Sequence, residues 1–211
     1  MATKIRLVAG LGNVGREYAS TRHNAGFWFA DALSMLLRVA FVREAKFFGD
    51  TARAAGSDIR LVKPGTYMNL SGRSVATLAN FYSIAPDEIL VVHDELDLKP
   101  GEAKLKLGGG VAGHNGLKDI REKLGTSDFW RLRLGIGHPR ESTLTEQEVA
   151  DYVLKPPWPD EQEAIERAIV KALDAWPAIA DGDFERAMLV LHTRPKKTEA
   201  VSEDQPKKGT E

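Results

Sequence analysis

The chain has 211 residues and a formal net charge of −1, with 43% hydrophobic and 28% charged residues, a composition that is ordinary for a globular protein and excludes collagen, a coiled coil and disorder along the whole length. It contains no cysteine, which excludes disulfides, thiolate catalysis and cysteine-based metal sites. No apolar run approaches the ~20 residues that a membrane span needs, so we expect a cytoplasmic protein without a membrane segment.

The first half of the chain alternates segments with strand and helix patterns. Glu88–His93 is nearly all apolar, and such a strand is buried on both faces, which favours an α/β sheet covered by helices. Gly56 and Ser57 predict a hairpin-like turn. In this half we predict strands at Lys4–Gly10, Phe47–Ala55, Asp58–Lys63 and Glu88–His93, and helices at Ala25–Val39 and Met68–Tyr82.

The second half continues this alternation until the last residues. We predict strands at Ala103–Leu107 and Phe129–Ile136, and helices at Asn115–Leu124, Thr145–Leu154, Asp160–Trp176 and Asp183–Leu191. Residues 194–211 are charged and polar with Val201 as the only large apolar side chain, so we expect a disordered tail. The sequence therefore predicts a single α/β domain over residues 1–193, with a twisted mixed β-sheet and helices on both faces.

Charge is unevenly distributed along the chain. Residues 97–140 carry nine lysines and arginines against five acids, a net +4, whereas residues 158–188 carry three against eight acids, a net −5. One surface can therefore face phosphates while another repels them. Two differently solvated faces explain the same counts equally well.

A glycine motif follows the first predicted strand. Gly10, Gly12 and Gly15 match G-x-G-x-x-G, the dinucleotide-binding pattern. The context argues against this function, because the residues after Gly15 are polar and lack helical spacing, and no acidic residue ends a second strand about twenty residues further on. A tight glycine turn explains the glycines but not the polar run up to Asn24.

Two residues predict a histidine–carboxylate pair. His23 lies on a loop between a strand and a helix, and Asp94 lies where a buried strand ends, so both belong to the edge of the sheet where α/β proteins bind ligands. A carboxylate bonded to one imidazole nitrogen fixes the tautomer and leaves the other nitrogen as a base. A metal site built from His23, Asp94, His93 and His114 is the alternative, although no short pair of histidines supports it.

Three asparagines lie on three polar loops: Asn13, Asn69 and Asn115. Their amides both donate and accept hydrogen bonds, which suits recognition of peptide or ester carbonyl groups. For Asn69 and Asn115 a helix cap is the alternative role, because each lies at the start of a predicted helix. The glycines over residues 108–116 are denser than a cap requires.

Together these motifs resemble those of bacterial peptidyl-tRNA hydrolases, and their order and spacing agree from Lys4 to His192. Val14 stands where that family usually has proline. Proline would stiffen this turn, and valine in its place loosens it slightly. The matching segments are Gly10–Gly26, Pro64–Gly72, His93–Asp97, Gly108–Leu117 and Arg131–Pro139.

The resemblance implies hydrolysis of the ester between a peptide and the 3′-terminal ribose of tRNA, with no cofactor and no metal. It implies that His23 is the general base, that Asp94 orients it, and that Asn115 positions the water or the substrate. Lys106 and Arg133 are implied to bind tRNA phosphates. The residues that the resemblance implies for the rest of substrate binding are Asn13, Tyr18, Tyr67, Met68 and Asn69.

The resemblance also implies a monomer whose partner is peptidyl-tRNA, and we expect residues 137–156 to form a mobile lid or loop at the cleft. Two other functions stay open. A non-catalytic RNA-binding relative of the same fold is disfavoured, because the candidate catalytic residues are all present and no Ser- and Arg-rich transit peptide is seen. A nucleotide-dependent oxidoreductase depends on the Gly10–Gly15 motif alone.

Overall fold

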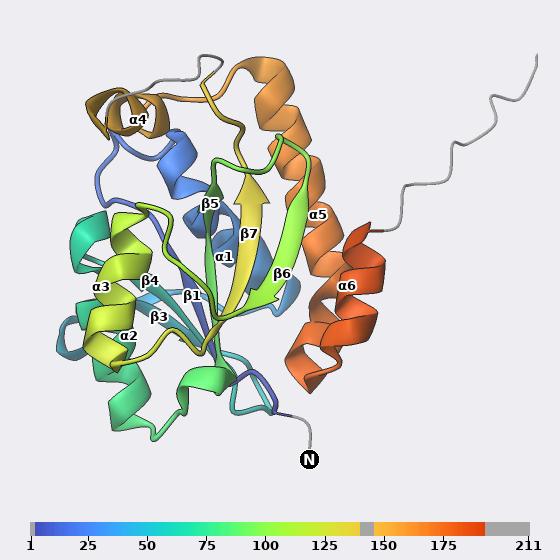
Figure 1. The fold of residues 1–211 in the computed structure, drawn as a ribbon. Coiled ribbons are helices and arrows are strands. Elements are labelled where there is room, and N and C mark those ends of the chain that lie inside the picture. The colour runs from blue at the N-terminus through green and yellow to red at the C-terminus, as the bar shows by residue number, and fades with distance from the viewer. Residues whose placement is uncertain (1–2, 140–145, 193–211) are drawn as a thin grey trace, which may run out of the picture.

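A seven-stranded mixed sheet forms the centre of the computed structural model, which describes residues 3–139 and 146–192 (Figure 1). The strand order is β2-β3-β4-β1-β5-β7-β6. The four middle strands, β4, β1, β5 and β7, run parallel, and the outer strands are antiparallel to their neighbours. The strands are β1 Leu7–Gly10, β2 Val42–Glu44, β3 Gly49–Arg53, β4 Arg60–Pro64, β5 Ile89–Glu95, β6 Ala103–Leu107 and β7 Trp130–Gly135.

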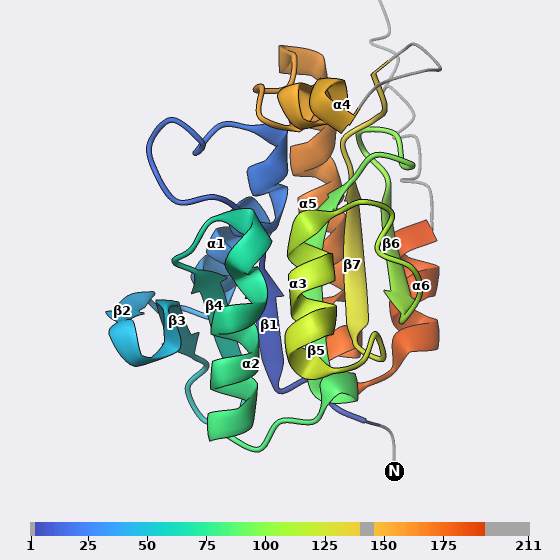
Figure 2. The ribbon, with the colours of Figure 1, turned by 60° about the vertical axis from the view of Figure 1, so that its left-hand side comes forward.

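Helices cover both faces of this sheet, which confirms the predicted α/β class (Figure 2). Alternate residues of β5 serve the two faces: Leu90 and Val92 belong to one apolar core, and Ile89 and Val91 to the other. The first core is covered by α1 Ala25–Leu36, α5 Pro159–Asp181 and α6 Phe184–His192, and the second by α2 Ser71–Phe81 and α3 Asn115–Leu124.

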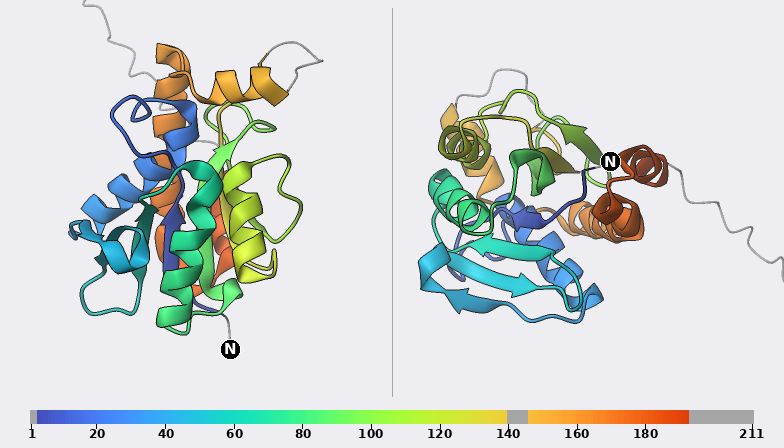
Figure 3. Two further views of the ribbon diagram at one scale, coloured as in Figure 1. Left: turned by 90° about the vertical axis from the view of Figure 1, so that its left-hand side faces the viewer. Right: turned by 90° about the horizontal axis from the view of Figure 1, so that it is seen from below.

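One further helix, α4 Glu146–Val153, lies beyond the carboxyl ends of the parallel strands (Figure 3). Because these strands are parallel, the loops that follow β1, β4 and β5 open at the same edge of the sheet. The fold therefore brings the predicted polar loops together beneath α4.

Several predicted boundaries are wrong, and packing explains the clearest case. The predicted helix Asp160–Trp176 continues through Pro177 to Asp181. Proline removes one backbone hydrogen bond, but continuation buries Ile179, three residues beyond Trp176, in the same apolar core. Burial of such a side chain stabilises by roughly 1.5–3 kcal/mol, which offsets the lost bond.

Local turns explain two other differences. The predicted strand Phe47–Ala55 begins only at Gly49, because Phe47 ends a short 3-10 helix, Ala45–Phe47, and Phe48 has a left-handed φ of 52°. The predicted helix Met68–Tyr82 begins with a 3-10 turn, Met68–Leu70, before α2. No sequence pattern predicts β2, a three-residue edge strand.

The remaining predictions concern the ends of the chain and the membrane. Among the described residues, no helix is both long enough and apolar enough to cross a membrane. The predicted tail, residues 194–211, and the boundary at residue 193 lie outside the described residues. So does the predicted start of α4 at Thr145.

Candidate active site

A cleft of about 1060 Å³ lies at the carboxyl edge of the parallel strands, beside α4. It receives side chains from the loops after β1, β4 and β5 and from the start of α3. The predicted site residues that line it are Asn13, His23, Tyr67, Met68, Asn69, Asp94, Lys106, Asn115 and Arg133. Tyr18, the remaining predicted residue, does not line the cleft.

The His23–Asp94 pair is formed as predicted. Asp94 lies near the end of β5, and His23 lies in a 3-10 turn, Arg22–Asn24, that directly precedes α1. His23 Nδ1 lies 2.9 and 3.0 Å from the two carboxylate oxygens. The Asp94 side chain is 3% exposed and that of His23 is 12% exposed, so the carboxylate is sealed while the imidazole edges the cleft.

The electrostatics of this pair favour a basic imidazole. Burial by itself lowers the pKa of His23, but the charge of Asp94 and the hydrogen bond to it raise the pKa above its ordinary value. Burial likewise raises the pKa of Asp94, but the two histidines bonded to it hold that pKa well below its ordinary value. Asp94 is therefore a carboxylate at neutral pH and a hydrogen-bond acceptor only.

His114, which the sequence indicates only as a possible metal ligand, also contacts Asp94. Its Nε2 lies 3.0 Å from Asp94 Oδ1, and its Nδ1 accepts the backbone N–H of Leu117 at 3.3 Å. Because Nδ1 is an acceptor there, the ring proton of neutral His114 lies on Nε2 and is donated to Asp94. In the sequence, only the glycine-rich segment ahead of the predicted helix points to His114 as part of a site.

The start of α3 shows that Asn115 is not the helix cap that the sequence allows as an alternative role. His114, not Asn115, is the N-cap residue of α3, and Asn115 is the first residue of the helix. Asn69 does not cap a helix either: α2 begins after Leu70, which has no side-chain cap bond. The exposed side chains of Asn69 and Asn115 instead line the cleft.

The predicted metal alternative is only partly assembled. Among the described residues, His23, Asp94 and His114 offer ligand atoms within 4.8 Å of one another. A metal on His114 Nε2 would move the ring proton to Nδ1, where Leu117 N–H already donates, so the donor set suits protons better than a cation. His93 lies outside this group; its Nδ1 donates to the backbone oxygen of Asp94, and burial lowers its pKa to about 3.

Asn13 is held by two neighbours that fix which of its atoms faces the cleft. Asn24 bonds both the backbone N–H and the backbone oxygen of Asn13, at 2.8 and 2.9 Å. Asn13 Oδ1 accepts the backbone N–H of Met68 at 2.7 Å. The amide NH₂ of Asn13 is therefore the group left to donate. Asn24, which the sequence indicates only as part of a motif, thus holds Asn13 in place.

The glycine motif serves packing between loop and helix. A Cβ on Gly10 would lie 2.3 Å from the backbone oxygen of Gly26, and one on Gly12 would lie 2.7 Å from the ring of Phe27. The next α-helix, α1, begins at Ala25, ten residues after Gly15. Gly15 thus does not start a helix that faces a pyrophosphate, which argues further against the dinucleotide function.

The two predicted phosphate-binding residues lie on one face of the β6–β7 pair. Lys106 is opposite Arg131, and Lys104 is opposite Arg133, and directly paired residues project to the same face. Arg131 is buried and donates to the backbone oxygens of residues 109 and 110. Arg133 Nε donates to Glu95 at 2.8 Å, and Lys106 is exposed.

The acidic segment lies on the opposite face of the sheet from these cations. The face of β5 and β7 that carries Val91 and Arg131 belongs to the side of α2 and α3. The acid-rich helices α5 and α6 cover the other side, as Figure 2 shows. The uneven charge of the sequence is therefore an uneven charge of the two faces.

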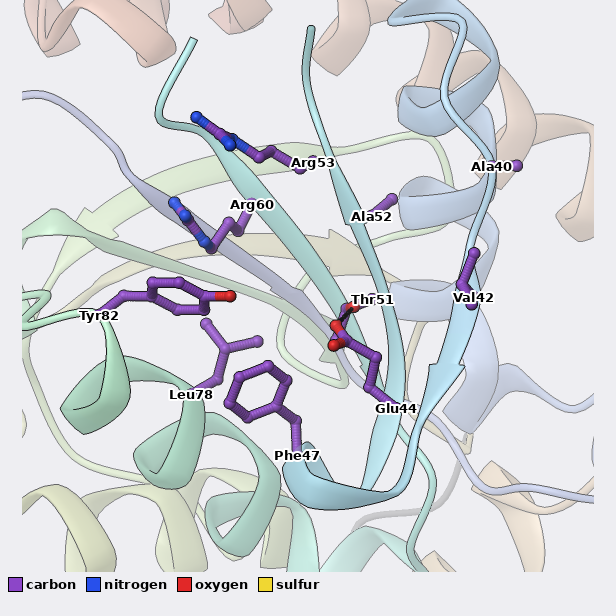
Figure 4. A pocket seen from close by; sticks show the side chains of 10 residues that line it. All are labelled: Ala40, Val42, Glu44, Phe47, Thr51, Ala52, Arg53, Arg60, Leu78 and Tyr82. Carbon is purple, nitrogen blue, oxygen red and sulfur yellow. Dashed lines mark hydrogen bonds between the residues drawn. The ribbon is translucent and has the colours of Figure 1, made fainter.

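A second cavity, of about 230 Å³, lies beside the edge strands β2 and β3, between β2–β4 and α2 (Figure 4). Arg60 lines one end and Glu44 the other. The Arg60 guanidinium stacks 3.6 Å from the centre of the Tyr82 ring and donates to Asp58 at 2.6 Å. None of the predicted site residues lines this cavity, so the cleft beside α4 is the candidate active site.

The fold and the cleft define an α/β enzyme with a histidine–carboxylate pair at the carboxyl edge of its sheet. The family model for peptidyl-tRNA hydrolase matches residues 7–200. The chain therefore belongs to the peptidyl-tRNA hydrolase family and is an enzyme that hydrolyses peptidyl-tRNA. This family match agrees with neither of the two alternatives, a non-catalytic RNA-binding relative and a nucleotide-dependent oxidoreductase.

Relatives of the family are similar along nearly their whole length. The peptidyl-tRNA hydrolase of Bordetella petrii is 58% identical over 92% of this chain and 92% of its own. That of Neisseria gonorrhoeae is 54% identical over 92% of this chain and 100% of its own. A crystal structure of peptidyl-tRNA hydrolase from Acinetobacter baumannii superposes with a TM-score of 0.85 at 44% identity, covering 90% of this chain and 96% of that one.

Proposed function

We propose that the chain hydrolyses peptidyl-tRNA by general-base catalysis with His23 as the base. The observation that carries this proposal is the Nδ1 contact of His23 with a sealed Asp94 at 2.9 Å. With Nδ1–H donated to Asp94, Nε2 is free to take a proton from water as the water attacks the ester carbonyl. The ribose 3′-oxygen then leaves with that proton as free tRNA, and the peptide acid that remains loses its own proton to solvent and becomes a carboxylate.

The asparagines supply the neutral donors for this step. Asn13 has its oxygen committed to the N–H of Met68, so its NH₂ can donate to the oxyanion that develops on the attacked carbonyl. Asn69 holds the peptide beside it, and Asn115 positions the water or the substrate. Tyr67, which is 60% exposed, and Met68, which is buried, form the wall of the cleft around the peptide.

Lys106 and Arg133 are the proposed phosphate-binding residues for the tRNA. Arg133 is held through its Nε by Glu95, which leaves the two NH₂ groups of the guanidinium for an anion. Contacts of this kind are independent of base sequence, which suits an enzyme that acts on many tRNAs. We further propose that the enzyme acts as a monomer in the cytoplasm.

The test is release of N-acetyl-amino acid from N-acetyl-aminoacyl-tRNA in the presence of EDTA. We expect His23→Ala to lower the rate by about 10²- to 10⁴-fold, while tRNA affinity and thermal unfolding stay close to wild type. His192→Ala is the matched control, because His192 lies at the end of α6, away from the cleft. A His23→Ala enzyme that retains the wild-type rate removes His23 from the mechanism, and loss of wild-type activity in EDTA contradicts metal independence.

A further inference from the structure

Arg22, the residue next to the proposed base, is a buried arginine with an unusual set of partners. Its side chain is 3% exposed. One terminal nitrogen donates to the backbone oxygens of Tyr152, Lys155 and Pro156, at 3.4, 3.2 and 2.9 Å. The other donates to Glu161 at 2.6 Å. The guanidinium also lies 4.1 Å from the centre of the Tyr152 ring.

All of these partners belong to one stretch of chain, the end of α4 and the start of α5. The backbone N–H of Arg22 donates to the same stretch, at the oxygen of Lys155, over 3.1 Å. A further hydrogen bond joins this stretch to the end of β7, because the Tyr152 hydroxyl donates to the backbone oxygen of Ile136 at 2.8 Å. The junction of α4 and α5 is thus fastened to the turn that carries His23.

The fastened helix forms a wall of the cleft. Val149, Ala150, Val153 and Leu154, all on or beside α4, line the same cavity as His23. Arg22 therefore connects, through contacts of its own, the catalytic base and the apolar wall beside it. A substrate that lies in this cleft lies between the two.

An arginine suits this connection for a chemical reason. Three backbone oxygens and one carboxylate surround a single planar guanidinium, whose two terminal nitrogens present four N–H donors in a fixed fork, while its Nε has no partner among the described residues. A lysine ammonium has three donors and no plane to lie over the Tyr152 ring. Lysine at this position keeps the charge but has fewer donors than the four acceptors around the guanidinium, so at least one of these contacts is lost, and each such loss loosens the junction.

We propose that Arg22 is a positioning residue that sets the spacing between His23 and the α4 wall, and through it the affinity for peptidyl-tRNA. The inference rests on the proposed function of His23. The His23–Asp94 pair is also held by His114, so loss of the Arg22 contacts leaves the base intact. The wall moves relative to the base, and substrate binding weakens while the proton chemistry persists.

Arg6 offers a matched control for a purely structural role. It donates to Asp58 and Glu88 and to the backbone oxygens of Tyr82 and Ser83, a partner set of the same kind. It directly precedes β1 at the amino edge of the sheet, opposite the cleft, and it does not line the cleft. Arg6→Lys therefore loses similar contacts far from the substrate.

The experiment compares Arg22→Lys with Arg6→Lys on N-acetyl-aminoacyl-tRNA. We expect both variants to unfold at lower temperature. Only Arg22→Lys should raise KM, by about 10-fold or more, with kcat within about 2-fold and the pH midpoint of kcat/KM unchanged. Hydrogen exchange of residues 149–156 should be faster in Arg22→Lys alone. An unchanged KM, or equal kinetic changes in both variants, overturns the proposal.

Glu161→Gln covers the case in which Arg22→Lys fails to fold. It removes the carboxylate partner but keeps the three backbone contacts of Arg22, so we expect a smaller rise in KM in the same direction. A folded Glu161→Gln enzyme with wild-type KM contradicts the proposal. His23→Ala in the same assay separates the two ideas: if it retains activity, the proposed base is wrong, while exchange of residues 149–156 still reports on Arg22.

Discussion

At the scale of single residues, the chemistry of the cleft depends on which ring nitrogens of His23 and His114 carry protons. Asp94 accepts from His23 Nδ1 and from His114 Nε2, and the backbone N–H of Leu117 fixes the tautomer of His114. When His23 and His114 are both neutral, each donates its ring proton to the Asp94 carboxylate. The other nitrogen of His23, Nε2, is then unprotonated. The three hydrogen bonds and the start of α3 thus leave an unprotonated ring nitrogen of His23 in the cleft, as the proposed base requires.

The raised pKa of His23 predicts the pH dependence of the reaction. A base works only when unprotonated, so kcat/KM should rise with pH through the pKa of His23, with a midpoint above its ordinary value of about 6.5. Asp94→Asn removes the charge that raises this pKa but leaves the burial that lowers it, so the midpoint should fall below that of wild type. The check is kcat/KM of both enzymes across the pH range; a midpoint that stays in place contradicts the pair.

The sequence predicted this residue pair but not its surroundings. His23 and Asp94 were predicted because each follows a strand at an edge where ligands bind, a rule of position along the chain. The role of His114 depends on which ring nitrogen meets the Leu117 N–H. That of Asn24 depends on a loop that folds back on Asn13. Neither leaves a periodic pattern that sequence reasoning can detect.

At the scale of elements, close packing of α1 against the loop after β1 places His23. A Cβ on Gly26 would lie 2.3 Å from the backbone oxygen of Val92 and 2.4 Å from the backbone nitrogen of Leu11. Both are main-chain atoms of the central strands or their ends, which cannot move without disturbing the sheet. Contact between elements therefore explains Gly10, Gly12 and Gly26, whereas Gly15 has a φ of 118° that favours glycine in its turn.

Gly26→Ala should accordingly lower the free energy of unfolding by about 2–4 kcal/mol, because overpacking forces backbone shifts. Denaturant titration measures the change. Gly110→Ala is the control, because a Cβ there would meet nothing within 4 Å, and it should change stability by less than about 1 kcal/mol. Equal effects at the two positions contradict the packing argument.

The β6–β7 pair carries the second prediction at this scale. Lys106→Ala with Arg133→Ala should raise KM for tRNA substrates and spare short esters, because only tRNA offers phosphates. The slope of log(kcat/KM) against log[salt] should become shallower by about 1–2 units. Arg167→Ala, on the exposed face of α5, should leave both quantities unchanged. Equal losses on both substrate types would show that the two cations act elsewhere in the reaction.

At the scale of the whole molecule, the described fold closes with α6. Ala187 and Leu191 of this helix are buried in the core on the α1 and α5 side of the sheet. We therefore expect a chain that ends at residue 193 to unfold at the same temperature and to keep the same kcat/KM as the full chain. Thermal unfolding and the release assay on both chains provide the check. A truncated chain that loses activity would place a substrate contact within residues 194–211.

The fold class, the order of most elements, the His23–Asp94 pair and the family follow from the sequence, because strands, helices and loop residues leave local patterns of period, charge and motif. The attachment of α4 to Arg22, the contact of His114 with Asp94, the exclusion of Tyr18 from the cleft and the continuation of α5 through Pro177 required the tertiary structure. Each depends on a contact between residues distant in the chain or on burial against another element, and neither is encoded in a window of neighbouring residues.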